Sequence, residues 1–255
     1  MRILLTNDDG YHAPGMAVLE AIARELSDDI WVVAPAEEQS GAGHSLTLTQ
    51  PIRLQKHGER RFAVRGTPTD SVMMGLGLLM KDNLPDLVLS GVNRGANLAE
   101  DVTYSGTVSA AMEATLYGIP AIALSQCLGS MRAAEAFETA AKWGATVVRA
   151  LAAKTWPKGV LMNVNFPAVA PDAVKGVRVT EQGFRDYGAT AIEERVDPRG
   201  FTYYWFGLGR EASEAGHLTD LQATHEGLIA VTPLHLDLTH YETLDAVRDA
   251  VKHLG

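Results

Sequence analysis

The chain of 255 residues has one cysteine, no long hydrophobic run and no excess of positive charge. Its single cysteine, Cys127, cannot form an intramolecular disulfide, which favours a reducing, cytoplasmic location. No apolar run reaches the roughly 18–20 residues that a membrane-spanning helix needs, so we expect no membrane partner. Arg2 is the only basic residue before the acidic Asp8, and such an N-terminus does not resemble a signal peptide.

The charge balance excludes one class of partner. The net charge is −9, from 22 Lys and Arg against 31 Asp and Glu, whereas proteins that bind nucleic-acid backbones carry clustered basic residues. We therefore expect no stable nucleic-acid partner. A small phosphate ester stays possible, because a bound cation and a few backbone amides can reverse the potential inside one pocket.

Short apolar runs alternate with helical patterns over the first two thirds of the chain. The apolar runs predict strands at residues 2–6, 30–34, 87–90, 121–125 and 160–164. The helical patterns lie at residues 14–26, 71–79, 107–117 and 133–152, and residues 47–54 and 61–64 predict a hairpin-like excursion. Strand–helix–strand units give parallel sheets with right-handed crossovers. Residues 1–170 are therefore interpreted as a Rossmann-like, doubly wound α/β catalytic core.

The pattern changes after about residue 170. Strand-like segments at 177–180, 202–205 and 228–233 are separated by polar, glycine-bearing stretches, and residues 243–254 predict an amphipathic helix. We interpret residues 171–255 as a β-rich extension with a C-terminal helix that reaches a neighbouring subunit.

Two adjacent aspartates follow the first predicted strand directly, in the segment Asn7-Asp8-Asp9-Gly10. In open parallel sheets, ligands gather at the carboxyl ends of the strands. Adjacent carboxylates repel each other unless a positive charge lies beside them, and Mg²⁺ and Mn²⁺ prefer oxygen ligands. Asp8 and Asp9 are therefore candidate metal ligands. The segment by itself is equally consistent with a polar turn in which one aspartate caps the following helix.

The loops after the second and third strands carry further polar groups on the same edge. Ser40 opens a glycine-rich loop whose hydroxyl groups could complete a metal shell, although a solvated connection is the simpler interpretation of this loop. For His44, which lies in the same loop, a surface position without a catalytic role is the simpler interpretation. After the third strand, in a loop over residues 91–97, Asn93 offers a carbonyl oxygen to a metal and Asn97 an amide to a phosphate. Asn and Gly are also the common residues of tight turns.

Two helix starts complete the pattern. Ser105, Gly106 and Thr107 precede a helix, whose free amides and dipole favour an anion, although a plain Ser or Thr N-cap gives the same sequence. The turn at residues 66–70 leads into the helix at 71, with Thr69 or Asp70 as the expected N-cap. Carboxylates, neutral oxygens and a helix N-terminus on one sheet edge together indicate metal-assisted attack on a phosphate ester.

These stretches, in this order, resemble the SurE family of 5′/3′-nucleotidases over nearly the whole chain. The resemblance lies in segments 3–10 (Ile-Leu-Leu-Thr-Asn-Asp-Asp-Gly), 34–41, 66–70, 90–97 and 104–113, and in the later segments 163–167, 197–200, 203–205 and 231–234. One departure is Thr69-Asp70-Ser71, where relatives often have Ala-Asp-Cys after the Gly-Thr-Pro turn.

The resemblance implies a Rossmann-like core that hydrolyses nucleoside monophosphates with one divalent ion per subunit, Mg²⁺ or Mn²⁺. It implies that Asp8, Asp9, Ser40 and Asn93 hold the ion, and that subunits exchange their C-terminal extension in a homodimer or homotetramer. From the residues we expect Asp8 and Asp9 to act in catalysis, and phosphate binding by Asn97, Ser105, Gly106 and Thr107.

Two other functions are weighed against hydrolysis. A non-catalytic nucleotide sensor could use the same metal and phosphate pocket, and the sequence does not separate it from an enzyme. An NAD-type oxidoreductase is disfavoured, because no Gly-x-Gly-x-x-Gly opens the first helix and an acidic first loop would repel a pyrophosphate.

Overall fold

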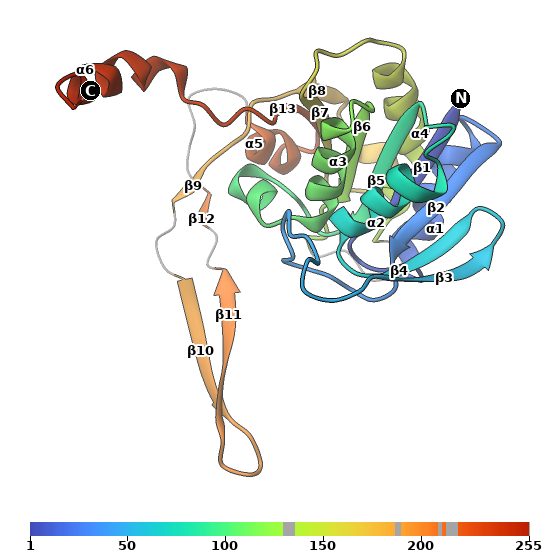
Figure 1. Cartoon of the computed structure of the whole chain (residues 1–255), viewed down its shortest axis with the longest axis horizontal. Coiled ribbons are helices and arrows are strands. Elements are labelled where there is room, and N and C mark those ends of the chain that lie inside the picture. Colours follow the sequence, from blue (N-terminus) through green and yellow to red (C-terminus); the bar gives the residue numbers. More distant parts are fainter. Residues whose placement is uncertain (130–135, 187–189, 209–210, 213–218, 255) are drawn as a thin grey trace.

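The centre of the structure is a nine-stranded sheet with the strand order β3-β4-β2-β1-β5-β6-β7-β13-β8 (Figure 1). The computed structural model describes residues 1–129, 136–186, 190–208, 211–212 and 219–254. Six neighbouring strands are parallel, which confirms the α/β prediction: β4 (Arg61–Arg65), β2 (Asp29–Pro35), β1 (Arg2–Thr6), β5 (Leu87–Arg94), β6 (Ala121–Gln126) and β7 (Val160–Phe166).

Helices cover both faces of the parallel strands. The side chains of β1 alternate, so that Ile3 and Leu5 join the core beneath α1 (Pro14–Arg24) and α4 (Glu138–Ala152). Leu4 joins the opposite core beneath α2 (Pro68–Met74) and α3 (Gly106–Leu116). Parallel strands buried on both faces need continuous apolar sequence, and that requirement made them predictable.

The last third of the chain adds two strands to the sheet and also forms segments that project from it. β13 (Ile229–His235) pairs antiparallel with β7, and β8 (Val177–Val179) pairs with β13. The short helix α5 (Asp220–His225) precedes β13. Figure 1 shows two arms that project from this body, one made by the hairpin of β10 (Thr190–Val196) and β11 (Thr202–Leu208) and one ending in α6 (Leu244–Val251). The small strands β9 (Arg185–Asp186) and β12 (Glu211–Ala212) pair at the base of the hairpin.

Several predicted boundaries were wrong. The predicted strand at 47–54 begins only at Arg53, as β3 (Arg53–Gly58), because the backbone N–H of Thr47 donates to the carboxylate of Asp70 (3.0 Å) instead of joining the sheet. β5 extends to Arg94, so the predicted loop at 91–97 is partly strand. The strand β10 was not predicted.

Two helix starts also differ from the sequence prediction. α2 begins at Pro68 with Thr67 as its N-cap, and Asp70 closes a capping box from the third helical position. α2 continues into a π-helical turn, Gly75–Leu79. Of the helix predicted at 133–152, residues 133–135 lie outside the described residues, and the helix begins at Glu138. Within the described part of the chain, no helix is long and apolar enough to cross a membrane.

Candidate active site

The site lies where the order of the sheet reverses. β1 is flanked by β2 on one side and by β5 on the other, so the chain winds away from β1 in both directions. In open α/β sheets, this reversal opens a crevice at the carboxyl ends of the strands, where ligands bind. Hydrogen bonds of Asp8 and Asp9 connect the loop after β1 to the loop after β2, to the end of β5 and to the start of α3 at this edge.

Asp8 is the buried carboxylate of this edge, with 5% of its surface exposed. Its Oδ1 accepts a hydrogen bond from the hydroxyl of Thr107, in the first turn of α3. Burial raises the pKa of Asp8 to about 6, although the Thr107 hydroxyl acts in the opposite direction, and the charge of Asp9 raises it further. A cation beside Asp8 would favour its charged form.

Gly106 makes this close approach of α3 possible. A Cβ at Gly106 would lie 2.7 Å from the Cβ of Asp8 and 3.0 Å from its Oδ2. Atoms at such distances clash, so a side chain here would push α3 away from the carboxylate. The glycine therefore sets the distance between Asp8 and the helix N-terminus.

Asp9 lies on the more open side of the same loop. Its Oδ2 accepts a hydrogen bond from the backbone N–H of Arg94 at 3.0 Å, which ties the end of β5 to the loop after β1. Burial raises the pKa of Asp9, and the nearby charge of Glu38 raises it further, whereas the Arg94 N–H lowers it. Both aspartates are thus held in surroundings that disfavour their negative charge.

Ser40 and Asn93 are next in sequence to residues that contact the aspartates, and they differ in exposure. The N–H of Gln39 donates to the carbonyl oxygen of Asp8 (2.8 Å), which brings the residue before Ser40 against this loop. The hydroxyl of Ser40 is exposed and donates to Glu38 Oε1 (2.8 Å). Asn93 lies on β5, and its side-chain amide donates to the carbonyl of Gly95 (3.0 Å).

The donor set fits a hard divalent cation. Asp8, Asp9, Ser40 and Asn93 offer oxygen atoms, which Mg²⁺ and Mn²⁺ prefer. Asn93 turns its amide nitrogen toward Gly95, and no described residue donates a hydrogen bond to its Oδ1. Among the described residues no group of three or more His, Cys, Asp or Glu could hold a metal. An ion bound at this edge would therefore need neutral oxygens as well as the two carboxylates.

Asn97 is held by residues that the sequence reasoning did not assign to the site. Its side-chain amide donates to Ser125 Oγ (2.8 Å), at the end of β6. Its N–H donates to Asn165 Oδ1 (2.9 Å), and its carbonyl accepts from the amides of Asn163 (2.7 Å) and Asn165 (3.0 Å). Two asparagines at the end of a predicted buried strand were the available sign of such a network.

The start of α3 has the local structure that the sequence predicted. Ser105 is the N-cap, and its hydroxyl accepts a hydrogen bond from the N–H of Val108 (3.0 Å). The glycine-rich loop lies against this helix, since Gly43 N donates to Tyr104 O (3.1 Å) and His44 Nε2 is 2.9 Å from Glu113 Oε2. His44 is exposed, as expected of a surface histidine, although its ring contacts α3 through Glu113.

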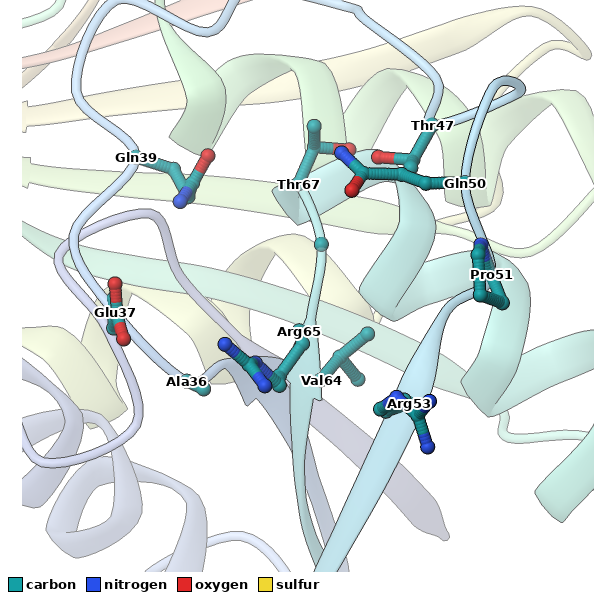
Figure 2. Close-up of a pocket in the computed structure, with 11 residues that line it drawn as sticks. Ala36, Glu37, Gln39, Thr47, Gln50, Pro51, Arg53, Val64, Arg65 and Thr67 are labelled. Atoms are coloured by element: carbon teal, nitrogen blue, oxygen red, sulfur yellow. The ribbon is translucent and has the colours of Figure 1, made fainter.

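A cavity of about 410 Å³ adjoins the aspartate loop (Figure 2). It lies between the loop after β2 and the β3–β4 hairpin, and Gln39 belongs both to its wall and to the contact with Asp8. None of the predicted site residues lines it. The cavity therefore lies next to the predicted metal site and does not include it.

The sequence profile of the family described as survival protein SurE matches residues 3–189. The chain belongs to the SurE family. It is similar to the 5′-nucleotidase SurE of Rhizorhabdus wittichii, with 61% identity over 248 residues that cover 96% of this chain and 98% of that protein. It is also similar to the 5′-nucleotidase SurE of Caulobacter vibrioides, with 54% identity over 250 residues that cover 97% and 95% of the two chains.

A solved structure shows the same fold. The crystal structure of the SurE protein from Aquifex aeolicus matches with a TM-score of 0.84 and 40% identity, covering 98% of this chain and 99% of that one. The resemblance to SurE proteins and the predicted Rossmann-like α/β fold are thereby confirmed. The roles of the individual site residues stay predictions.

Proposed function

We propose that this SurE-family chain is a 5′-nucleotidase that hydrolyses nucleoside 5′- and 3′-monophosphates to nucleoside and phosphate with a divalent metal ion. The observation that carries the proposal is the meeting of Asp8, Asp9 and the N-terminus of α3 at the switch point of the sheet. Carboxylates suit a cation, and a helix N-terminus suits an anion. Its relatives, which are named 5′-nucleotidases, support the same reaction.

In this proposal Asp8, Asp9, Ser40 and Asn93 hold one Mg²⁺ or Mn²⁺ per subunit. A bound ion would screen the charge on a phosphate oxygen. Ser105, Gly106 and Thr107 bring the helix N-terminus to the remaining oxygens.

The chain's own residues also orient the reacting groups. The Thr107 hydroxyl fixes the Asp8 carboxylate. Asn97 already donates one amide hydrogen to Ser125, and its second hydrogen is the one that a phosphate would accept. The attacking group is either a water that an aspartate positions or an aspartate itself. Acid-quench trapping of protein-bound phosphate distinguishes the two routes.

Phosphate release from a panel of nucleoside monophosphates tests the proposal. We expect turnover with Mg²⁺ or Mn²⁺, its loss in EDTA, and its recovery when the metal is restored. Asp8→Asn and Asp9→Asn are each expected to abolish most of the turnover. Activity that survives chelation, or a fully active aspartate variant, would remove the metal or that residue from the mechanism.

A nucleotide sensor is the alternative for the same pocket. It predicts stoichiometric, metal-dependent binding of nucleotide with no phosphate release. Calorimetry and the release assay on one preparation separate the two functions.

We also propose a homodimer or homotetramer built through the projecting arms. The β10–β11 hairpin exposes Ile192, Phe201, Tyr204 and Trp205, each more than half exposed, on a segment that lies away from the body (Figure 1). Apolar side chains on a thin arm are expected to be buried by another subunit. Sedimentation velocity measures the assembly, and a monomer at all concentrations would contradict it. A cytoplasmic location, expected from the single cysteine, is tested by fractionation.

A further inference from the structure

Two arginines lie opposite each other in the β3–β4 hairpin, and neither has a partner among the described residues. Arg53 and Arg65 are directly opposite residues of antiparallel strands, so their side chains share one face, and both line the cavity of Figure 2. Like charges in this position destabilise a sheet. Within the described residues, neither guanidinium has a hydrogen bond or an ion pair. Both arginines are exposed, so water and salt screen their repulsion and their guanidinium groups are open to a ligand from solution.

The other two arginines of the hairpin are paired. Arg60 contacts Asp29 Oδ1 at 2.7 Å, and Arg61 contacts Glu20 Oε1 at 2.5 Å. Of these four arginines, only Arg53 and Arg65, which line the cavity, have no acidic partner among the described residues. This contrast points to an anion that comes from outside the chain.

The buried carboxylate of Asp70 fixes one wall of the cavity. Asp70, 2% exposed, accepts hydrogen bonds from the backbone N–H groups of Thr47 (3.0 Å) and Thr67 (2.8 Å). Gly66 packs so closely that a Cβ there would lie 2.6 Å from Asp70 Oδ2. The amides of Gln39 and Gln50 lie at the other end of the cavity from the guanidinium groups (Figure 2). Glu37 is the one carboxylate among the lining residues.

We propose that Arg53 and Arg65 form a second anion subsite, which binds a phosphate of the substrate other than the one that is hydrolysed. Arginine suits this role, because its planar guanidinium binds phosphate through two parallel hydrogen bonds. The inference rests on the proposed nucleotidase function. It extends the substrate class from nucleoside monophosphates to nucleotides with a second phosphate.

The position of the subsite decides which second phosphate it takes. Arg65 is on β4 and Arg53 is on β3, two and three strands from β1, which puts the ends of these strands roughly 10 and 15 Å from the end of β1. Phosphates that share a bridging oxygen lie much closer together than this. The subsite therefore takes a phosphate on the far side of a nucleoside, either the second monoester of a 3′,5′-bisphosphate or the diester of a 5′-phosphorylated dinucleotide.

Steady-state kinetics on three substrates tests the proposal: a nucleoside 5′-monophosphate, its 3′,5′-bisphosphate and a 5′-phosphorylated dinucleotide. We expect a lower KM for at least one of the doubly charged substrates than for the monophosphate. Arg53→Gln and Arg65→Gln should each raise that KM about 3- to 10-fold with little change in kcat, and the effect should shrink at high ionic strength. The substrate whose KM is no longer lower than that of the monophosphate in the arginine variants shows whether the subsite binds the monoester or the diester.

Lys56→Gln is the matched control, because it removes one charge from the same hairpin outside the cavity. A double arginine variant that keeps the wild-type KM ratio would overturn the proposal, and so would an equal rise in KM for the monophosphate. Thermal unfolding without ligand should show no loss of stability in either variant, since a repulsive pair is removed. If no nucleotide is turned over, the proposed function fails, and calorimetry with the 3′,5′-bisphosphate still tests the subsite.

Discussion

Replacing Asp8 by asparagine should change how the stability of the metal-free protein depends on pH. Burial raises the pKa of Asp8 from 3.8 to about 6 in the folded protein. The shift is about two units, and each unit corresponds to about 1.4 kcal/mol, so ionising Asp8 costs about 3 kcal/mol of folding free energy. The Asp8→Asn variant has no charge at this position and no such cost.

The sign follows from proton binding. Between about pH 4 and pH 6 the folded protein holds a proton on Asp8 that the unfolded chain releases. The contribution of Asp8 to the free energy of unfolding is therefore fully present below pH 4 and is lost as the pH rises through 6. The advantage of Asp8→Asn over wild type should therefore grow by about 3 kcal/mol between pH 4 and pH 7.5. An unpaired amide hydrogen lowers the stability of the variant at both pH values alike, so the difference between the two is the quantity to measure.

Urea unfolding in EDTA at pH 4 and pH 7.5 measures the free energy of unfolding for both proteins. Asp9→Asn is the control, because Asp9 is less buried and its variant should show the same direction with a smaller change. At pH 7.5, added Mg²⁺ should stabilise wild type more than Asp8→Asn. An advantage of equal size at both pH values would refute the reasoning, since it would show that the charge of Asp8 carries no cost.

Three further outcomes are expected. Thr107→Val removes the hydrogen bond from the Thr107 hydroxyl to Asp8 and should lower kcat/KM about 10- to 100-fold. Thr107→Ser keeps the hydroxyl and should retain most of the activity, and both variants should keep the wild-type circular dichroism spectrum. Asn165→Leu leaves the buried backbone of Asn97 without two hydrogen bonds, so urea unfolding should show a loss of about 2–4 kcal/mol; a loss smaller than about 1 kcal/mol would contradict this network. Trp205→Glu should shift the sedimentation coefficient toward the monomer, and an unchanged assembly would exclude this side chain from the interface.

The parallel core was predictable because each central strand is buried on both faces. Such strands are mostly apolar, and Pro35, Pro120 and Gly159 border three of them, so residues 2–6, 30–34, 121–125 and 160–164 all lie within strands of the structure. The strand β10 lacks this property, since Glu193, Glu194 and Arg195 lie within it and it pairs with β11 outside the main sheet. A strand that buries little of itself leaves little hydrophobic pattern to detect.

The helix start at residues 66–70 shows a second limit. Thr69 or Asp70 was expected to be the N-cap, but Thr67 takes that position, with Pro68 after it. The two carboxylate oxygens of Asp70 accept hydrogen bonds from the backbone of Thr47 and Thr67. The contact with Thr47 is 23 residues distant in sequence, and no local preference encodes it.

The sequence by itself determined which residue types end the central strands: two aspartates, a serine loop, two asparagines and a helix start. Local preferences are enough for this, because turns and caps select such residues wherever they occur. Only the tertiary structure decided that Thr107 donates to Asp8 across 99 residues, that Asn97 binds Ser125, and that Arg53 and Arg65 face one cavity unpaired among the described residues. These contacts depend on strand order and on the packing of α3 against the sheet, which the whole chain sets together.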